Sequence, residues 1–202
     1  MTDFSFRQVQ PDDVNFFIKA FHEVEPTFYS FQDGYAWDTF AKFICNPNDN
    51  SFTLVAEEDG SIAGFYISVT HAKNFWQSYL NMLGAKYLLS WTIKSKFSKK
   101  RITPENVDES EIDPEYKELF DHWVDDIPGH AKGVYVYMRS ESRGKGLAGA
   151  IVLEIESRLK NMGYASLEGT IKFGNEQSYR MLSRSGYSIR NVGICNYVFK
   201  KL

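Results

Sequence analysis

The residues best suited to chemistry lie in one glycine-rich stretch, Arg143-Gly144-Lys145-Gly146-Leu147-Ala148, directly before an apolar helical pattern. Unpaired backbone N–H groups at the start of a helix attract anions, and glycines let phosphate oxygens approach the backbone closely. Arg143 and Lys145 add full positive charges to this arrangement. The stretch predicts a phosphate-binding loop, with a plain surface turn as the alternative.

The loop departs from two common nucleotide-binding motifs. Neither Ser nor Thr follows Gly144-Lys145, so the stretch is not a Walker loop, which needs a hydroxyl at that position. The third glycine of the dinucleotide fingerprint is also missing. The residues alone therefore predict a bound anion without naming it.

Composition limits the classes of protein that remain. The chain has 202 residues, 43% of them apolar and 16% aromatic, which predicts one globular domain with an aromatic core. Its net charge of -3 argues against nucleic acid as a partner. Two separated cysteines exclude a disulfide framework and a zinc cluster, so we expect no metal site. No apolar run reaches about 20 residues and no leader pattern opens the sequence, which predicts a soluble, cytoplasmic protein.

The N-terminal third predicts a strand, two helices and a hairpin. Residues 4–9 alternate as a half-buried strand does, and a helix is expected from Pro11 onwards. A second helix is predicted around 37–44. Residues 52–69 predict an antiparallel hairpin that turns at Asp59-Gly60.

The C-terminal third predicts the elements that position the loop. A strand at 133–138 precedes the loop, and a long helix that ends at Gly163 follows it. A strand at 165–171, a helix from Asn175 to Ser185 and two strands within 187–200 complete the pattern. The apolar stripe expected on the long helix consists of Leu147, Ile151, Ile155, Leu159 and Met162.

Two runs of opposite charge lie between these thirds. Residues 71–103 contain no acidic residue and predict a basic, aromatic amphipathic helix, whereas 104–126 contain ten acidic groups and one lysine. We expect the two runs to pack beside each other. The cations of the first run are Lys73, Lys86, Lys94, Lys96, Lys99, Lys100 and Arg101.

Three sequence features together resemble the GNAT acetyltransferase superfamily. Arg143-x-x-Gly146-x-Ala148 resembles its coenzyme A pyrophosphate motif, Arg/Gln-x-x-Gly-x-Gly/Ala. Asn175-x-x-Ser178, followed by Leu182 and Gly186-Tyr187, resembles its second signature, and the opening FRQVQPDD resembles its first strand and helix. The order of elements also matches along the chain, apart from about 71–129.

The resemblance implies an α/β (α+β) GNAT fold in one domain, 1–202, with a helical charged insertion at about 71–129. Its mixed, mostly antiparallel sheet would be splayed where acetyl-CoA binds. Similar enzymes hold the pantetheine arm with the backbone at positions that match Met138, Arg139 and Ser140, where the usual Val-x-Pro is absent. The other positions implied to bind coenzyme are Arg143, Gly144, Lys145, Gly146, Leu147, Ala148 and Asn175.

The implied reaction is direct acetyl transfer to an amine, for which a base and a proton donor are needed. Many family members carry a Tyr donor where this chain has Leu182, so Ser178 and Tyr179 are the substitutes predicted, unless they only cap or pack the helix. Glu168 is a candidate base, or a solvated strand residue. Tyr137 and Tyr135 share a strand face and fit packing or acceptor shaping better than base catalysis, since a phenol titrates near pH 10.

The acceptor is predicted only as a class. The cations of 71–103 suit a small anionic amine, such as an amino sugar nucleotide, and a loose resemblance to acetyltransferases of bacterial surface sugar synthesis points the same way. Alternatively, the charged runs pair with each other and cover the sheet, or 72–101 contacts a membrane. A non-catalytic acyl-CoA sensor is the competing function, and a homodimer is an alternative to a monomer.

Overall fold

The computed structural model of this protein describes residues 4–24, 33–46, 48–87, 114, 116, 126–193 and 195–202. Outside about 71–129, its longer elements follow the order that the sequence predicts. In chain order they are β1 (Phe4–Gln8), α1 (Val14–Val24), α2 (Gly34–Cys45), β2 (Ser51–Glu58), β3 (Ser61–Val69), α3 (Ala72–Leu83), β4 (His130–Met138), α6 (Leu147–Asn161), β5 (Ser166–Ile171), α7 (Glu176–Arg184), β6 (Ser188–Asn191) and β7 (Asn196–Lys201). Short 3-10 helices occupy Pro11–Asp13 and Ser140–Ser142.

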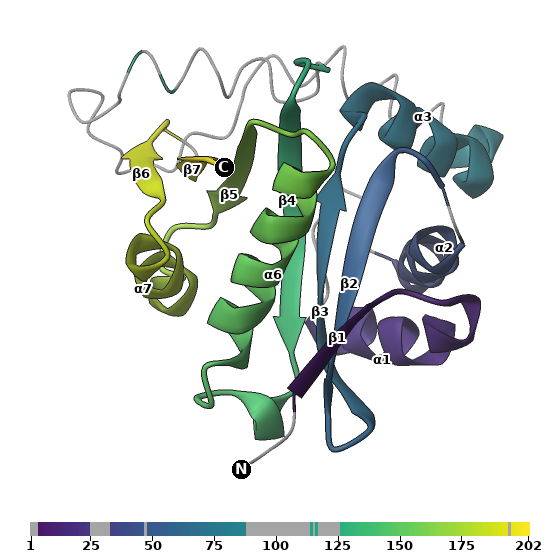
Figure 1. Cartoon of the computed structure of the whole chain (residues 1–202). Helices are drawn as coiled ribbons and strands as arrows, with labels where there is room; N and C mark the ends of the chain where they lie inside the picture. Colours follow the sequence, from purple (N-terminus) through teal and green to yellow (C-terminus); the bar gives the residue numbers. More distant parts are fainter. Residues whose placement is uncertain are drawn as a thin grey trace.

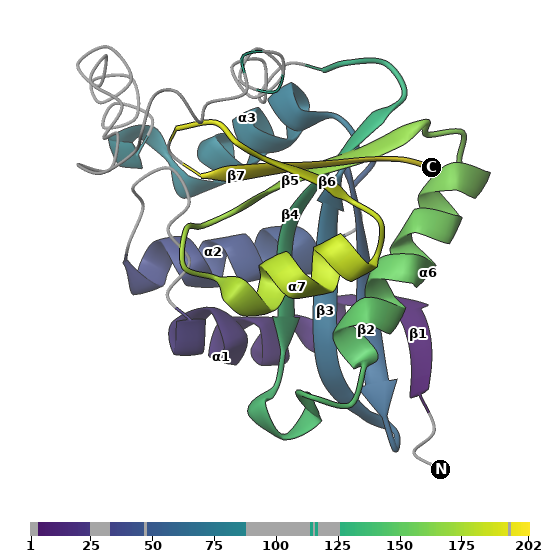
Figure 2. The ribbon, with the colours of Figure 1, turned by 90° about the vertical axis from the view of Figure 1, so that its left-hand side faces the viewer.

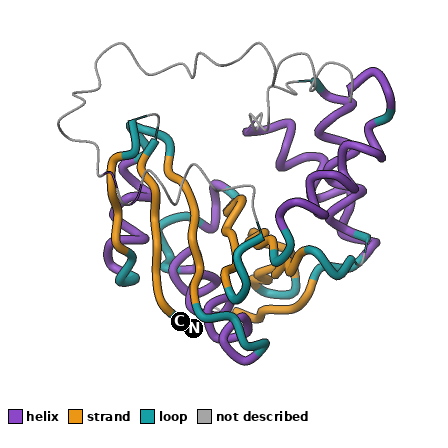
Figure 3. The backbone as a smooth tube through the Cα atoms, turned by 90° about the horizontal axis from the view of Figure 1, so that it is seen from above, coloured by secondary structure: helices purple, strands orange, loops and turns teal. Residues whose placement is uncertain are grey.

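The strands form one seven-stranded sheet in the order β1-β2-β3-β4-β5-β7-β6. Every neighbouring pair is antiparallel except β4 and β5, which are parallel. Helix α6 lies across one face, and α1, α2 and α3 lie on the other (Figures 1 and 2). Seen from above, helices flank the strands on both sides (Figure 3). The predicted mixed, mostly antiparallel sheet is confirmed.

The two faces of the sheet are packed with different side chains. The core under α1, α2 and α3 is dominated by aromatic rings; Phe65 of β3, for example, stacks on Phe17 of α1 at a centroid distance of 4.1 Å. The core under α6 is mainly aliphatic. Ring pairs of this kind add about 0.5–1.5 kcal/mol beyond the area they bury. The aromatic composition is thus largely used on one face.

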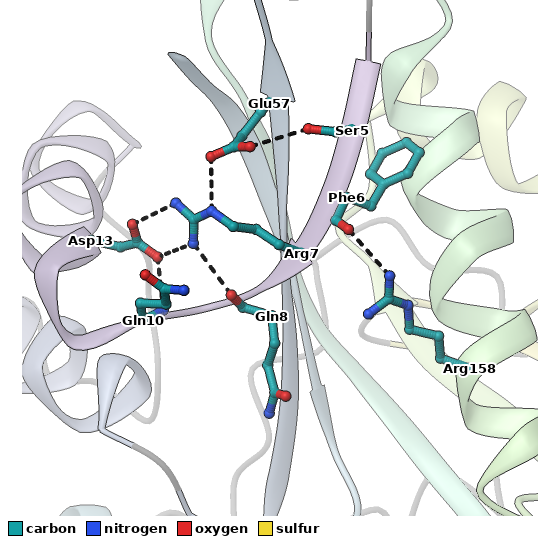
Figure 4. Close-up of polar contacts among 8 residues, drawn as sticks. All are labelled: Ser5, Phe6, Arg7, Gln8, Gln10, Asp13, Glu57 and Arg158. Carbon is teal, nitrogen blue, oxygen red and sulfur yellow. Dashed lines mark hydrogen bonds and ion pairs between the residues drawn. The ribbon is translucent and has the colours of Figure 1, made fainter. Parts of the chain in front are cut away.

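The first strand is fixed to the rest of the domain by charged side chains (Figure 4). Arg7 makes a two-pronged contact with Asp13 at 2.7 and 2.8 Å, and its Nε donates to Glu57 Oε1 of β2 at 2.8 Å. Arg158 of α6 donates to the Phe6 carbonyl at 3.2 Å. Because planar Arg–carboxylate pairs are geometrically specific, this network sets where α1 begins relative to β1 and β2.

Most local predictions are confirmed. The hairpin turns at Asp59 and Gly60, whose φ angles of 52° and 75° fit the tight turn expected there. On α6, Leu147, Ile151, Ile155 and Leu159 are buried as predicted, and the helix ends just before Gly163. Met162 was wrongly assigned to that stripe: it is 52% exposed, because it follows the last helical turn and lies off the buried face.

The basic amphipathic helix is confirmed only in its first half. Helix α3 buries Phe75, Trp76, Tyr79, Leu80 and Leu83 in the aromatic core, but it ends at Leu83 because Gly84 adopts a φ of 91°. The predicted uninterrupted helix through Tyr87 is therefore wrong. Trp91 and the cations from Lys94 to Arg101 lie outside the described residues, as do nine of the ten acidic groups.

The tenth acidic group, Asp126, connects the two ends of the charged segment. Its Oδ1 accepts a hydrogen bond from the Lys73 backbone N–H at 3.2 Å. This contact joins the start of α3 to the segment that leads into β4. Furthermore, the apolar side chains of α3 that a membrane anchor would need are buried in the protein core, which argues against that alternative.

Candidate active site

The glycine-rich loop has the geometry of an anion site. Gly144 and Gly146 adopt φ angles of 79° and 84°, a region that side chains disfavour, and α6 begins immediately afterwards at Leu147. A Cβ placed at Gly144, Gly146 or Gly149 would meet no heavy atom within 4 Å, so the space beside the loop and first helical turn is open. The N–H groups of this 15-residue helix face that space at its N-terminal end.

The loop is held in place by a buried carboxylate that the sequence did not indicate. Glu58, the last residue of β2, accepts a hydrogen bond from Ser142 Oγ at 2.6 Å and forms an ion pair with Lys145 Nζ. The Lys145 contact, followed by Ser142, keeps the pKa of Glu58 below its usual range. Lys145, predicted as an anion ligand, thus also fixes the loop. The contacts join positions 84 and 87 residues apart, beyond any local pattern.

Among the described residues, no strand pairs with the second edge of β4 next to the loop. Its pairing with β5 ends at Gly133↔Gly169, although β4 continues to Met138. The Arg139 N–H donates to the Ala63 carbonyl of β3 at 2.8 Å. Since orientation alternates along an antiparallel pair, the N–H groups of Val136 and Met138 point away from β3, toward the side that β5 has left.

The residues predicted to bind the pantetheine arm differ in whether their backbone N–H points toward this edge. The Met138 N–H is directed toward the open edge, and its carbonyl accepts from Arg143 Nε at 2.9 Å. By contrast, the Arg139 N–H is already used within the sheet, so this group is not available to the coenzyme. Ser140 is exposed at the start of the short 3-10 helix.

Leu147 and Ala148 can offer only backbone groups of α6. Leu147 is 1% exposed, with its side chain in the aliphatic core, and Ala148 is half-buried against that core. The N-terminal N–H groups of the helix remain the part of these residues that an anion could reach.

Tyr137 lies on the other side of β4 and contacts a second carboxylate missed by the sequence reasoning. Its Oη donates to Glu23 Oε2, at the end of α1, at 2.5 Å. Arg143 Nη2 lies 3.6 Å from Glu23 Oε1. Burial, and then the hydrogen bond to Glu23, raise the pKa of Tyr137 above its usual value. A phenol with a raised pKa is a donor at neutral pH, so Tyr137 is unsuited to act as the base.

Glu168 does not face the loop. Its carboxylate is 1% exposed and forms an ion pair with Lys132 Nζ at 2.9 Å, while Tyr197 Oη donates to its other oxygen. Both oxygens of Glu168 are occupied in the sheet, so the expectation of a carboxylate open to an acceptor is not met at this position.

Ser178 and Tyr179, the two residues predicted to replace the missing tyrosine, differ in how they lie on α7. Asn175 caps the helix, because its Oδ1 accepts the Ser178 N–H at 3.1 Å. Ser178 is half-buried, as is Leu182 one turn later, and Leu182 packs against the aliphatic core. Tyr179 is 41% exposed and does not share this inner face. Only Ser178 thus keeps the orientation expected of the Leu182 position.

The fold and the loop together define the class of acyl-coenzyme A-dependent transferases. The model of the acetyltransferase (GNAT) family matches residues 17–187, so the chain belongs to the GNAT family and is an N-acetyltransferase by class. The predicted family and enzyme class are confirmed. Among curated proteins, no relative matches the chain.

Solved structures of similar fold are N-acetyltransferases. PaiA N-acetyltransferase from Thermoplasma acidophilum, in complex with coenzyme A, has a TM-score of 0.59 and 13% identity over 99% of each chain. Ribosomal-protein-alanine N-acetyltransferase from Brucella melitensis has a TM-score of 0.58 and 15% identity over 98% of this chain and 99% of that one. An N-acetyltransferase from Staphylococcus aureus Mu50 has a TM-score of 0.56 and 15% identity over 99% and 98%. At these identities the likeness shows a shared fold.

Two further features concern the part of the chain that the structure describes. Within them, no helix is both long and apolar enough to cross a membrane. The same residues contain no group of three His, Cys, Asp or Glu side chains placed to hold a metal ion.

Proposed function

We propose that this protein transfers an acetyl group from acetyl-CoA directly to the primary amine of a small, anionic acceptor. The observation that carries the proposal is the open anion loop at the start of α6, placed next to the unpaired edge of β4. An anionic pyrophosphate fits the loop, and an amide-containing arm fits an edge that offers the N–H groups of Val136 and Met138. The two features lie on consecutive segments of chain.

The chain's own residues then have separate roles. Arg143, Lys145 and the N–H groups of Gly144 to Ala148 bind the pyrophosphate, and the Met138 N–H orients the thioester. Asn175 fixes the first turn of α7, so that Ser178 faces inward. The amine nitrogen forms a bond to the acyl carbon, the carbon–sulfur bond breaks, and Ser178 donates a hydrogen bond or a proton to the leaving sulfur.

The anionic character of the acceptor rests on the charged segment. Seven cations without a counter-charge between 71 and 103 suit the phosphates of an amino sugar nucleotide. Of these cations, Lys73 and Lys86 lie in the part of the chain that the structure describes. Two neighbours of similar fold are named for ribosomal-protein-alanine acetylation, so a protein N-terminus is the acceptor class against which the proposal is tested.

A second candidate function is an acyl-CoA sensor without turnover. Leu182 favours it, because an alkyl side chain at the position of the usual proton donor cannot protonate a thiolate. The inward-facing Ser178 supports the enzyme instead.

One experiment separates the candidates. Calorimetric titration with acetyl-CoA is followed in the same sample by thiol release with a panel of amines: amino sugar nucleotides, the corresponding sugars without nucleotide, and a peptide with an N-terminal alanine. Binding with release that depends on the nucleotide supports the proposal. Release with the peptide alone overturns the acceptor class, binding without release supports the sensor, and absence of binding overturns both.

A further inference from the structure

The carboxylate of Glu23 lies beside β4 and the glycine-rich loop, and the coenzyme-binding roles of these two segments do not explain why it is there. It lies in the last turn of α1, and Tyr137 Oη of β4 donates to its Oε2 at 2.5 Å. Its other oxygen, Oε1, lies 3.6 Å from Arg143 Nη2, beyond normal hydrogen-bond distance. The end of α1 thus meets β4 and the loop that follows it at one side chain.

Glu23 differs from Glu58 and Glu168 in accessibility. Glu58 and Glu168 are buried, and each has both oxygens occupied by protein donors. Glu23 is 51% exposed, has one oxygen fixed by a buried phenol, and has a second oxygen open to solvent beside a guanidinium. It is therefore oriented by the protein and still reachable by a ligand.

The position of Glu23 relative to the scissile bond follows from β4. Tyr137 precedes Met138, whose N–H faces the open edge where the proposed function places the thioester. Side chains of adjacent strand residues point to opposite faces, and Tyr137 points to the face covered by α1. A ligand bound at Glu23 therefore approaches the edge from the α1 face, opposite the core under α6.

We propose that Glu23 binds the ammonium group of the acceptor and takes the proton that must leave before attack. This inference rests on the proposed function and names the residue that makes its amine nucleophilic. Glu23 removes one proton from the R–NH3+ group, and the resulting neutral amine forms the carbon–nitrogen bond as the carbon–sulfur bond breaks. After attack, the nitrogen loses a second proton, which protonates the leaving thiolate. The proton on Glu23 passes to water.

Tyr137 is a positioning residue in this scheme. Its hydrogen bond fixes Oε2, so that Oε1 is presented to the ligand. The groups around the pair of Glu23 and Tyr137 are Tyr135 of β4, Arg143 of the loop and Glu141 before it, and burial raises the pKa of Tyr135 to about 12. Both phenols stay protonated at neutral pH, so neither of them takes the proton.

The test compares Glu23→Gln with the wild type in steady-state assays with the best amine of the panel. We expect kcat/KM for the acceptor to fall about 100-fold or more, with the Kd for acetyl-CoA unchanged within about twofold. Tyr137→Phe should give a smaller loss, and Glu23→Asp should recover part of the activity.

A matched control is Asp38→Asn, which removes an exposed carboxylate paired with His22, the residue before Glu23, at 2.8 Å. This variant should keep wild-type kinetics. If Glu23→Gln keeps kcat/KM within about threefold while the wild type still releases thiol with the acceptor, the role of Glu23 is overturned and the proposed function stands. If the wild type neither binds acetyl-CoA nor releases thiol, both fail.

Discussion

Three glutamates around the proposed site show how surroundings divide one residue type into different roles. Glu58 is buried under the loop and fixes it through Ser142 and Lys145. Glu168 is buried in an ion pair with Lys132. Glu23 is exposed and held through one oxygen. Removing the partner of Glu58 or Glu168 would leave an unpaired buried charge, which is strongly destabilising. Glu23, by contrast, can be changed with little effect on folding.

The loop assignment is tested at Gly146. Gly146→Asp should weaken acetyl-CoA binding by more than about 100-fold, which is about 3 kcal/mol, because a side chain and a negative charge enter the space of the pyrophosphate. Calorimetry measures this loss. Gly163→Asp, at the other end of α6, is the control, since Gly163 also has a left-handed φ, of 91°, and open space beside it. Retained affinity in Gly146→Asp would remove the loop from the coenzyme site.

The proton donor is tested on α7. Ser178→Ala should lower kcat about 100-fold with little change in the Kd for acetyl-CoA, because the lost hydroxyl acts on the leaving sulfur. Tyr179→Phe should be nearly silent, since this phenol is exposed on the outer side of the helix. Rate measurements at saturating acceptor decide between them. An unchanged kcat in the double variant, Ser178→Ala with Tyr179→Phe, would exclude both hydroxyls as donors.

At the scale of elements, α3 belongs to the core although it lies within the segment predicted as an insertion. Phe75 is completely buried and Tyr79 Oη donates to the Ala36 carbonyl of α2 at 2.8 Å. The domain therefore needs at least this first part of the segment, and we propose that the insertion proper begins after α3.

A core substitution measures this contribution. Phe75→Ala should reduce the free energy of unfolding by about 3–5 kcal/mol, because it removes a buried ring from a packed cluster. Urea denaturation followed by far-ultraviolet circular dichroism gives the value. Met82→Ala is the control on the same helix, since Met82 is 43% exposed. A loss below about 1 kcal/mol in Phe75→Ala would mean that α3 is peripheral to folding.

The sequence was sufficient for elements whose signals are local. The Asp59-Gly60 turn and the apolar stripe of α6 follow from neighbouring residues, and so does the glycine loop. It was insufficient for contacts between distant segments. Tyr137 and Glu23 are 114 positions apart, and periodicity cannot show which side chains meet after folding. Glu168 fits a solvated strand by pattern, and only its partners show that it is buried.

At the scale of the whole molecule, we propose that the chain folds as one cooperative domain. The two cysteines test this, because Cys45 ends helix α2 whereas Cys195 lies near the C-terminal strands. Cys45 is buried in the aromatic core and Cys195 lies between β6 and β7. Burial raises the pKa of each thiol to about 12.

Both thiols should become reactive over the same range of urea concentration, since unfolding of a single domain exposes them together. Single Cys45→Ser and Cys195→Ser variants, treated with a thiol reagent during the titration, report one position each. Two well-separated midpoints would show independently unfolding parts and contradict a single domain.

The unequal division of aromatic side chains between the two faces has a practical consequence for optical work. Both tryptophans of the described residues, Trp37 and Trp76, lie on the α1, α2 and α3 face. The emission of these two indoles should therefore respond to events on the face that Glu23 shares. Binding at the α6 face would leave the emission of that pair nearly constant. In a variant with Trp91 and Trp123 changed to Phe, a fluorescence change would therefore distinguish acceptor from coenzyme without any label.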